Sequence, residues 1–172
     1  GYSSTNTWSD SELNKTNLNA NFIANIGEEW ANKIAETTWK VGGNTYSSIS
    51  QVVSSTAYQN EIVNPVTTNT TDNATEYTAK IGLMYVSDYG FGADPSAWAT
   101  TLYNYNGNVN GSTIRALNWM YMGLWEWTIS RDADTSGDAV HMLDDGCVDG
   151  NGVYNYFAVH PSFNLLSSIT YV

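Results

Sequence analysis

The chain has 172 residues, enough for one compact domain with a hydrophobic core, and its net charge is −11. Only six residues are Lys or Arg, so no basic patch can form, which argues against binding to nucleic acid or to anionic membranes. Few charged residues, much Asn, Ser and Thr, and seven Trp with twelve Tyr are more typical of secreted and surface proteins than of cytosolic enzymes.

Cys147 is the only cysteine, so the chain forms no internal disulfide and no Cys-based metal cluster. Its neighbours Asp144, Asp145 and Asp149 are expected to raise the pKa of the thiol, which argues against a catalytic thiolate. No segment is apolar enough to span a bilayer, and no signal peptide opens the chain. The abrupt ends indicate a fragment of a longer surface or virion protein, with any anchor outside it.

The first predicted element is a helix that begins near Ser9. Ser9 and Glu12 have the spacing of a capping box, and Gly27 is a natural end for the helix. Its apolar stripe consists of Leu13, Leu18, Phe22, Ile23 and Ile26. Residues 28–34 are expected to add one or two helical turns, with Trp30 and Ile34 turned inward.

The next segments predict strands and a long loop. Residues 37–41 are typical of a strand, with a hairpin turn at 42–44 and a return at 45–49. The Thr- and Asn-rich residues 65–78 predict an exposed loop. Residues 80–87, KIGLMYVS, form an apolar run without a helical period, which predicts a buried strand.

Asp94 and Pro95 predict a helix start, with the helix running to about Tyr103, and residues 105–112 are turn material. We find no long repeat, linker or break in composition, so residues 1–172 are predicted to form a single domain. Helices early, strands late and long irregular loops between them indicate an α+β fold with a mostly antiparallel sheet.

Residues 125–163 carry the most distinctive pattern. Trp125, Trp127 and Ile129 alternate with polar residues, which predicts a strand with both Trp side chains on one core-facing face. After Arg131, short apolar pieces alternate with polar, acidic and Gly-rich turns. A fixed apolar skeleton with a dense polar surface is typical of a binding face.

Several short motifs, in their order and spacing, resemble a known family over nearly the whole chain. They are Trp8-Ser9-Asp10-Ser11, Leu13, Leu18-Asn19, residues 81–89 (IGLMYVSDY), residues 125–131 (WEWTISR) and residues 158–165 (AVHPSFNL). They are similar to C-type-lectin-like domains at the C-termini of surface and pilin-like proteins of gut Firmicutes and their phages. Related domains are the variable proteins of diversity-generating retroelements.

The resemblance implies a C-type-lectin-like fold whose last third displays a hypervariable ligand-binding surface. Residues 132–157 have the amino-acid composition that adenine-directed mutagenesis produces in such proteins, which is rich in Asp, Asn, Ser, Tyr and Gly. Where the family usually has Arg, this chain has His160, which removes a cation that could pair with a buried carboxylate. Formylglycine-generating enzymes share a lectin-like fold but need a cysteine pair, so their activity is excluded.

The candidate ligand contacts are spread over this last third. They are Asp132, Asp134, Asp138, His141, Leu143, Asp145, Cys147, Asp149, Asn151, Tyr154, Asn155 and Tyr156. Tyr154 and Tyr156 stand among Gly and Asn, the composition of antibody-like paratopes. We expect substitutions to leave folding nearly unchanged, as surface substitutions usually do, at Asp132, Asp134, His141, Asp145, Asn151, Tyr154 and Asn155.

Residues 132–137 match the start of a calcium loop, but the closing Glu is missing because the twelfth position is Leu143. No cofactor or metal is therefore expected, although Asp138, Asp144 or Asp145 offer other closures. His141 and His160 have no second His nearby for zinc, and no G-x-S-x-G elbow exists, so no enzyme is expected.

The predicted function is a non-enzymatic adhesin or receptor-binding domain on a bacterial surface, a pilus or a phage particle. Its expected partner is a protein or glycan on another cell or host surface. A passive structural module of a pilus or virion is the first alternative. A calcium-dependent carbohydrate-binding domain is another, although the usual Glu-Pro-Asn, Gln-Pro-Asp and Trp-Asn-Asp signatures are absent.

Overall fold

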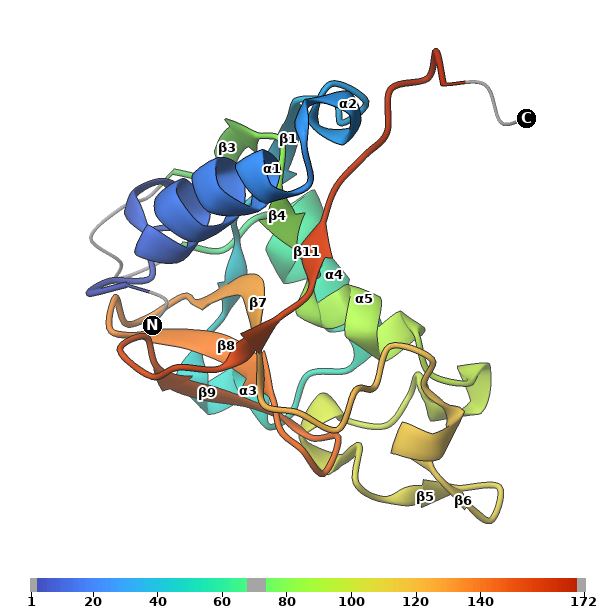
Figure 1. Ribbon diagram of the computed structural model, residues 1–172. Helices are drawn as coiled ribbons and strands as arrows, with labels where there is room; N and C mark the ends of the chain where they lie inside the picture. Colours follow the sequence, from blue (N-terminus) through green and yellow to red (C-terminus); the bar gives the residue numbers. More distant parts are fainter. Residues whose placement is uncertain (1–2, 68–73, 170–172) are drawn as a thin grey trace.

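In the computed structural model, which describes residues 3–67 and 74–169, strand β7 (Glu126–Asp132) is the centre of the main sheet (Figure 1). Strand β8 (Asp138–Met142) pairs with it in antiparallel fashion, and β9 (Val148–Gly152) pairs in the same way with β8. On the other edge of β7, two short strands pair in parallel, β10 (Ala158–Val159) near its start and β2 (Gly43–Asn44) near its end.

Three two-stranded antiparallel sheets complete the strand pairing of the described residues. They are β1 (Thr37–Lys40) with β3 (Glu76–Ala79), β4 (Gly82–Leu83) with β11 (Pro161–Ser162), and β5 (Asn108–Val109) with β6 (Ser112–Thr113). The fold is mixed α+β with several antiparallel sheets, which confirms the predicted class at this level.

The helices are mostly short. The longest helical run begins with the π-helical η2 (Leu13–Phe22) and continues into α1 (Ile23–Asn25). The other α-helices are α2 (Glu28–Ala31), α3 (Tyr46–Ile49), α4 (Ser54–Tyr58), which continues into the π-helical η3 (Gln59–Val63), and α5 (Val86–Phe91). The 3₁₀ helices are η1 (Trp8–Asp10), η4 (Pro95–Ala97), η5 (Leu102–Asn104) and η6 (Ile114–Leu117).

The main sheet separates two apolar clusters. Trp127 and Ile129 of β7 belong to the first, together with residues of η1, η2 and β1. Val140 and Met142 of β8 belong to the second, which includes residues of α3, α4 and α5. Both faces of the sheet are therefore covered, and all seven residues of β7 are buried.

Burial of both faces explains why the alternation in β7 does not separate a core face from a solvent face. The polar residues Glu126, Thr128 and Ser130 are at most 3% exposed. The β7–β8 register also shifts between Trp127 and Arg131. There the Thr128 hydroxyl donates to the Val140 carbonyl at 2.8 Å, so the irregular pairing retains its hydrogen bonding.

A buried carboxyl group joins three elements next to β7. The Ser130 hydroxyl donates to Glu61 Oε1 at 2.6 Å, the Ser87 amide donates to Oε2 at 3.1 Å, and Glu61 is fully buried. Ser130 Oγ also accepts from the Val86 amide at 3.1 Å. Burial raises the pKa of Glu61 to about 7, although the bonds to Ser130 and Ser87 act in the opposite direction.

The structure corrects several predictions in the first part of the chain. The helix is capped by Ser11 instead of Ser9, because the Asn14 amide donates to Ser11 Oγ at 3.0 Å. Gly27 ends the helix with φ +85°, as predicted. Ile34 is buried as predicted, but Trp30 is 56% exposed.

The predicted hairpin over residues 37–49 is also wrong. β1 pairs with β3, β2 pairs with β7, and residues 46–49 form helix α3. Gly43 permits this close approach, since a Cβ there would lie 1.8 Å from the Arg131 carbonyl oxygen. The predicted loop 65–78 contains β3 at its end, and residues 68–73 lie outside the described range.

Later elements are shorter than predicted. Residues 81–87 are buried, but only Gly82–Leu83 is a strand, and α5 begins at Val86. The Asp94 cap is confirmed, with the Ser96 amide donating to Oδ1 at 2.9 Å, yet the helix ends at Ala97. Trp39 is buried, whereas Trp119 is 81% exposed. Within the described residues, no helix has the length and apolarity needed to cross a membrane.

We predict that Trp127→Ala lowers the free energy of unfolding by about 3–5 kcal/mol, because the buried indole leaves a cavity. The matched control is Trp119→Ala, which removes an exposed indole and is expected to change stability by less than about 0.5 kcal/mol. Urea denaturation measures both variants. Equal losses in the two would contradict the placement of Trp127 in the core.

Candidate functional site

The predicted contacts do not form one continuous surface, because β8 and β9 separate them into two groups. Near the turn between these strands, four of them line a pocket of about 260 Å³ together with residues 103, 104 and 106. These four are Leu143, Asp145, Cys147 and Asp149. The loop after β7 and the turn after β9 belong to the opposite end of the hairpin, where Asp138 pairs with Gly152.

Two predicted contacts are corrected by burial, and a third is limited by it. Asp132 is 0% exposed and His141 is 1% exposed, so neither presents a side chain to a surface ligand. Cys147 is 6% exposed and reaches only the wall of the 260 Å³ pocket. Asp132 ends the buried strand β7, and His141 lies in the middle of the hairpin. The expectation that substitutions at Asp132 and His141 leave folding unchanged is therefore wrong.

His141 is part of an aromatic cluster. Its ring centroid lies 5.5 Å from that of Trp125, 5.7 Å from that of Trp127 and 4.8 Å from that of Phe157. Burial lowers the pKa of His141, so the imidazole is held in its neutral form. Phe157, at the end of the tyrosine-bearing turn, contacts both Trp rings. Trp127 is buried as predicted, but Trp125 precedes β7 and is 40% exposed, so the prediction of a core position is wrong for Trp125.

The loop after β7 is organised around Asn6, a residue from the other end of the chain. Asn6 Nδ2 lies 2.7–2.9 Å from the carbonyl oxygens of Asp132, Thr135 and Asp138, and Asn6 is fully buried. Its backbone amide donates to the Ser136 carbonyl at 2.8 Å. An amide nitrogen therefore occupies the position toward which the carbonyls of the suspected calcium loop converge.

The two first acidic residues of this loop interact with each other. The Asp134 amide donates to Asp132 Oδ1 at 3.2 Å, and Asp134 Oδ1 accepts from the Tyr46 amide at 3.1 Å. Burial and the adjacent Asp134 carboxylate raise the pKa of Asp132 to about 7. The interaction with Asp132 and the hydrogen bond from the Tyr46 amide lower the pKa of Asp134, which keeps that partly exposed carboxyl group ionised.

The turn after β9 presents two tyrosines to solvent, with 73% of Tyr154 and 87% of Tyr156 exposed. Asn155 Nδ2 donates to Asn151 Oδ1 at 2.8 Å, and the Asn155 amide donates to the Gly152 carbonyl at 3.0 Å. The Tyr154 ring packs over Gly152, where a Cβ would lie 2.4 Å from Cε1. The turn is thus held by its own hydrogen bonds, and its rings are free to contact a ligand.

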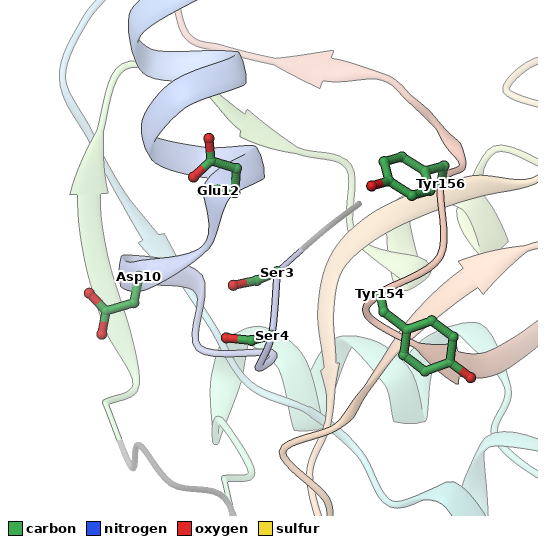
Figure 2. A pocket seen from close by; sticks show the side chains of 6 residues that line it. All are labelled: Ser3, Ser4, Asp10, Glu12, Tyr154 and Tyr156. Carbon is green, nitrogen blue, oxygen red and sulfur yellow. The ribbon is translucent and has the colours of Figure 1, made fainter.

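Tyr154 and Tyr156 form one wall of a groove of about 570 Å³ (Figure 2). Asp10 and Glu12 lie on the opposite side, and Ser3 and Ser4 lie between the two walls. We name this site the tyrosine groove, lined by Ser3, Ser4, Asp10, Glu12, Tyr154 and Tyr156.

The N-terminal side of the tyrosine groove is absent from the predicted site. The hydrogen bond from the Ser3 amide to the Val153 carbonyl (3.2 Å) and the Asn6 contacts bring that segment to the turn after β9. In the sequence, the spacing of Glu12 is that of a helix-capping residue. A capping role is enough to explain a carboxylate at that position, so nothing marks Glu12 as a groove residue. No signal in the local sequence relates residues 3–12 to residue 154.

His160 faces a buried carboxylate, contrary to the inference that its position had lost such a pairing. Its Nδ1 lies 3.4 Å from Oε2 of Glu126, which is 3% exposed. Burial raises the pKa of Glu126, while the charge of a protonated His160 acts in the opposite direction.

No protein-family model, curated protein or solved structure gives a significant match to the chain. In the described part of the chain, no group of three or more His, Cys, Asp or Glu side chains is placed to hold a metal ion.

We predict that the stability difference between the wild type and Glu61→Gln depends on pH. The folded-state pKa of Glu61, about 7, lies above its unfolded value, so the folded protein binds the extra proton and gains stability as pH falls from 8 to 5. Relative to the Gln variant, the wild type is expected to gain on the order of 1–3 kcal/mol. Denaturation at several pH values measures this, and parallel curves would contradict it. Using the variant as reference cancels the contribution of Asp132, whose pKa shifts in the same direction.

We also predict that calcium chelation leaves the melting temperature unchanged, because Asn6 supplies the bonds that organise loop 132–138. Asn6→Ala should instead cost at least about 2 kcal/mol, since it leaves buried carbonyl oxygens without a donor. Thermal melts with and without EDTA measure both effects. A fall on chelation that added calcium reverses would favour the calcium-loop interpretation, since a site at 100-fold its Kd stabilises by about 2.7 kcal/mol.

Proposed function

We propose that this protein is a non-enzymatic ligand-binding domain with a C-type-lectin-like fold, acting as an adhesin or receptor-binding head. The proposed location is extracellular, on a bacterial surface, a pilus or a phage particle. The sequence motifs support the family, and the α+β fold with its antiparallel hairpin late in the chain is compatible with it.

The observation that carries the proposal is the exposure of Tyr154 and Tyr156 on a hydrogen-bonded turn beside a groove. Exposed aromatic residues cost a soluble domain part of its solubility, and two of them on one ordered turn favour a contact role. Their rings need little additional ordering on binding, because the turn is already fixed. Such preorganised aromatic residues are typical anchors of a recognition surface.

The charge of this region favours some partners over others. Asp134, Asp138, Asp145 and Asp149 are partly exposed. Arg131 does not present its charge on this surface, because its buried guanidinium donates to the Val41 and Ala74 carbonyls. The surface potential is therefore negative, which disfavours nucleic acid and other anionic partners and favours a protein or neutral glycan with donor or basic groups.

The chemistry of the candidate nucleophile and base supports a binding role. Burial raises the pKa of Cys147 to about 11, with Asp145 and Asp149 acting in the same direction, so the thiolate is disfavoured. His141 is enclosed by aromatic rings and held neutral without a nucleophile beside it. Within the part of the chain that the structure describes, neither residue is paired with the partner that acyl-transfer chemistry requires.

A screen against glycan arrays and displayed peptide libraries tests the proposal. For any ligand found, we predict that replacing both Tyr154 and Tyr156 by Ala weakens affinity at least about tenfold, the effect of losing 1.4 kcal/mol, with an unchanged melting temperature. Tyr58→Ala, at a 40% exposed tyrosine of α4, is the matched control and should leave affinity unchanged.

If the double variant binds as tightly as the wild type, the tyrosine turn is not part of the recognition surface.

Sibling sequences give a second test, because substitutions concentrated at single positions within 132–157 support recognition, whereas scattered substitutions favour a passive module. For a basic partner, association is expected to slow as salt is raised. A rate that increases with salt would indicate an acidic partner instead.

A further inference from the structure

The tyrosine groove combines aromatic and acidic groups on facing sides. Asp10 belongs to η1 and Glu12 directly precedes η2, whereas Tyr154 and Tyr156 belong to the turn after β9 (Figure 2). Hydrogen bonds from Ser3 and Asn6 to the C-terminal third bring these segments together. The groove is thus a product of the tertiary fold, and its volume of about 570 Å³ is in the range of small-molecule sites.

The groove has an unbalanced negative charge. None of the described residues that line it is Lys, Arg or His. Asp10 Oδ1 forms an ion pair with Lys15 Nζ at 2.8 Å. Within residues 3–67 and 74–169, the negative charge of Glu12, the second carboxylate, is therefore the one without a paired cation. The Glu12 side chain is exposed, and its carboxylate makes no hydrogen bond or ion pair with another described residue. An anionic ligand would meet repulsion there, while a cation would gain an opposite charge.

The tyrosine rings add an attraction for the same kind of ligand. The face of an aromatic ring is electronegative and attracts ammonium groups within about 6 Å of its centroid. The Tyr154 ring lies over Gly152, which fixes one side of the ring and leaves 73% of the side chain exposed. Tyr156 directs its hydroxyl end toward the side of the groove where Glu12 lies (Figure 2). The Tyr154 ring points away from Glu12 in Figure 2, so Tyr156 and the Glu12 carboxylate are the groups placed to recognise an organic cation, with Tyr154 at the edge of the groove.

We propose that the tyrosine groove binds an alkylammonium group, either a free quaternary amine or the side-chain ammonium of a lysine in a partner protein. This inference rests on the proposed ligand-binding function and specifies its chemistry. The ammonium lies against the Tyr156 ring with Glu12 as its counter-charge, and the remaining volume, bordered by Tyr154, accommodates the rest of the ligand. A neutral sugar could pack against the rings but would gain no electrostatic attraction from the Glu12 carboxylate.

The test uses two pairs of probes that differ in charge and match in shape. Choline is compared with 3,3-dimethyl-1-butanol, and N-acetyl-lysine amide with N-acetyl-norleucine amide, by NMR titration of the 172-residue chain. In at least one pair the cation is expected to bind about tenfold more tightly than its neutral isostere, since cation–π and charge contributions of this kind have that magnitude. The pair that shows the larger ratio identifies the source of the ammonium group.

Two variants separate a site-specific effect from the overall negative charge. Glu12→Gln should weaken cation binding about fivefold or more and leave the neutral isostere unaffected. Glu28→Gln removes the same charge at an exposed position of α2 and should change neither. Replacing Tyr156 by Leu tests the ring contribution, because its 87% exposure makes an effect on folding small.

Equal affinity for cations and isosteres, or a Glu12→Gln variant that behaves like Glu28→Gln, would overturn the inference. If the double tyrosine variant loses a neutral glycan or peptide found by screening while no cation binds, the ligand class is wrong and the proposed binding function stands. If the tyrosine substitutions affect no ligand at all, both the ligand class and the tyrosine turn as a recognition surface fail together.

Discussion

The fold depends on the burial of β7 on all sides. One edge pairs with β8, and the other is shared by three separate segments: β10 at Glu126 and Trp127, the Met84 carbonyl at the Ile129 amide (3.1 Å), and β2 at Arg131 and Asp132. Because an open strand edge leaves backbone groups without partners, each short segment satisfies a part of β7 that the others cannot reach. The long irregular connections between them follow from this requirement.

A strand buried on both faces must also satisfy the polar side chains that it carries. Ser130 and Glu61 bond each other, Thr128 donates across the irregular pairing with β8, and His160 faces Glu126. These contacts join β7 to residues up to 69 positions away in sequence. An unpartnered buried polar group destabilises a fold more than a satisfied one stabilises it, so such contacts select one arrangement of the loops.

The sequence predicts the fold class, the Trp127 face, Gly27 and the Asp94 cap, because each depends on local chemistry or periodicity. It fails for residues 42–49, where a Gly-Gly-Asn turn signal is overridden by the pairing of β2 with β7. It also misplaces Asp132 and His141, since acidic and imidazole groups are assigned to solvent unless their buried partners are known. Half of the tyrosine groove was unpredictable because its walls are more than 140 positions apart in the chain, from Glu12 to Tyr154.

The way in which Asn6 holds loop 132–138 separates the shape of that loop from its composition. The amide bonds carbonyl oxygens only, and every amino acid has a carbonyl oxygen at that place in its backbone. Replacing the side chain of Asp134, Thr135 or Ser136 leaves these bonds available, as long as the backbone keeps its path. One asparagine outside the loop thus fixes the backbone of residues 132–138 through contacts that do not depend on which side chains the loop carries.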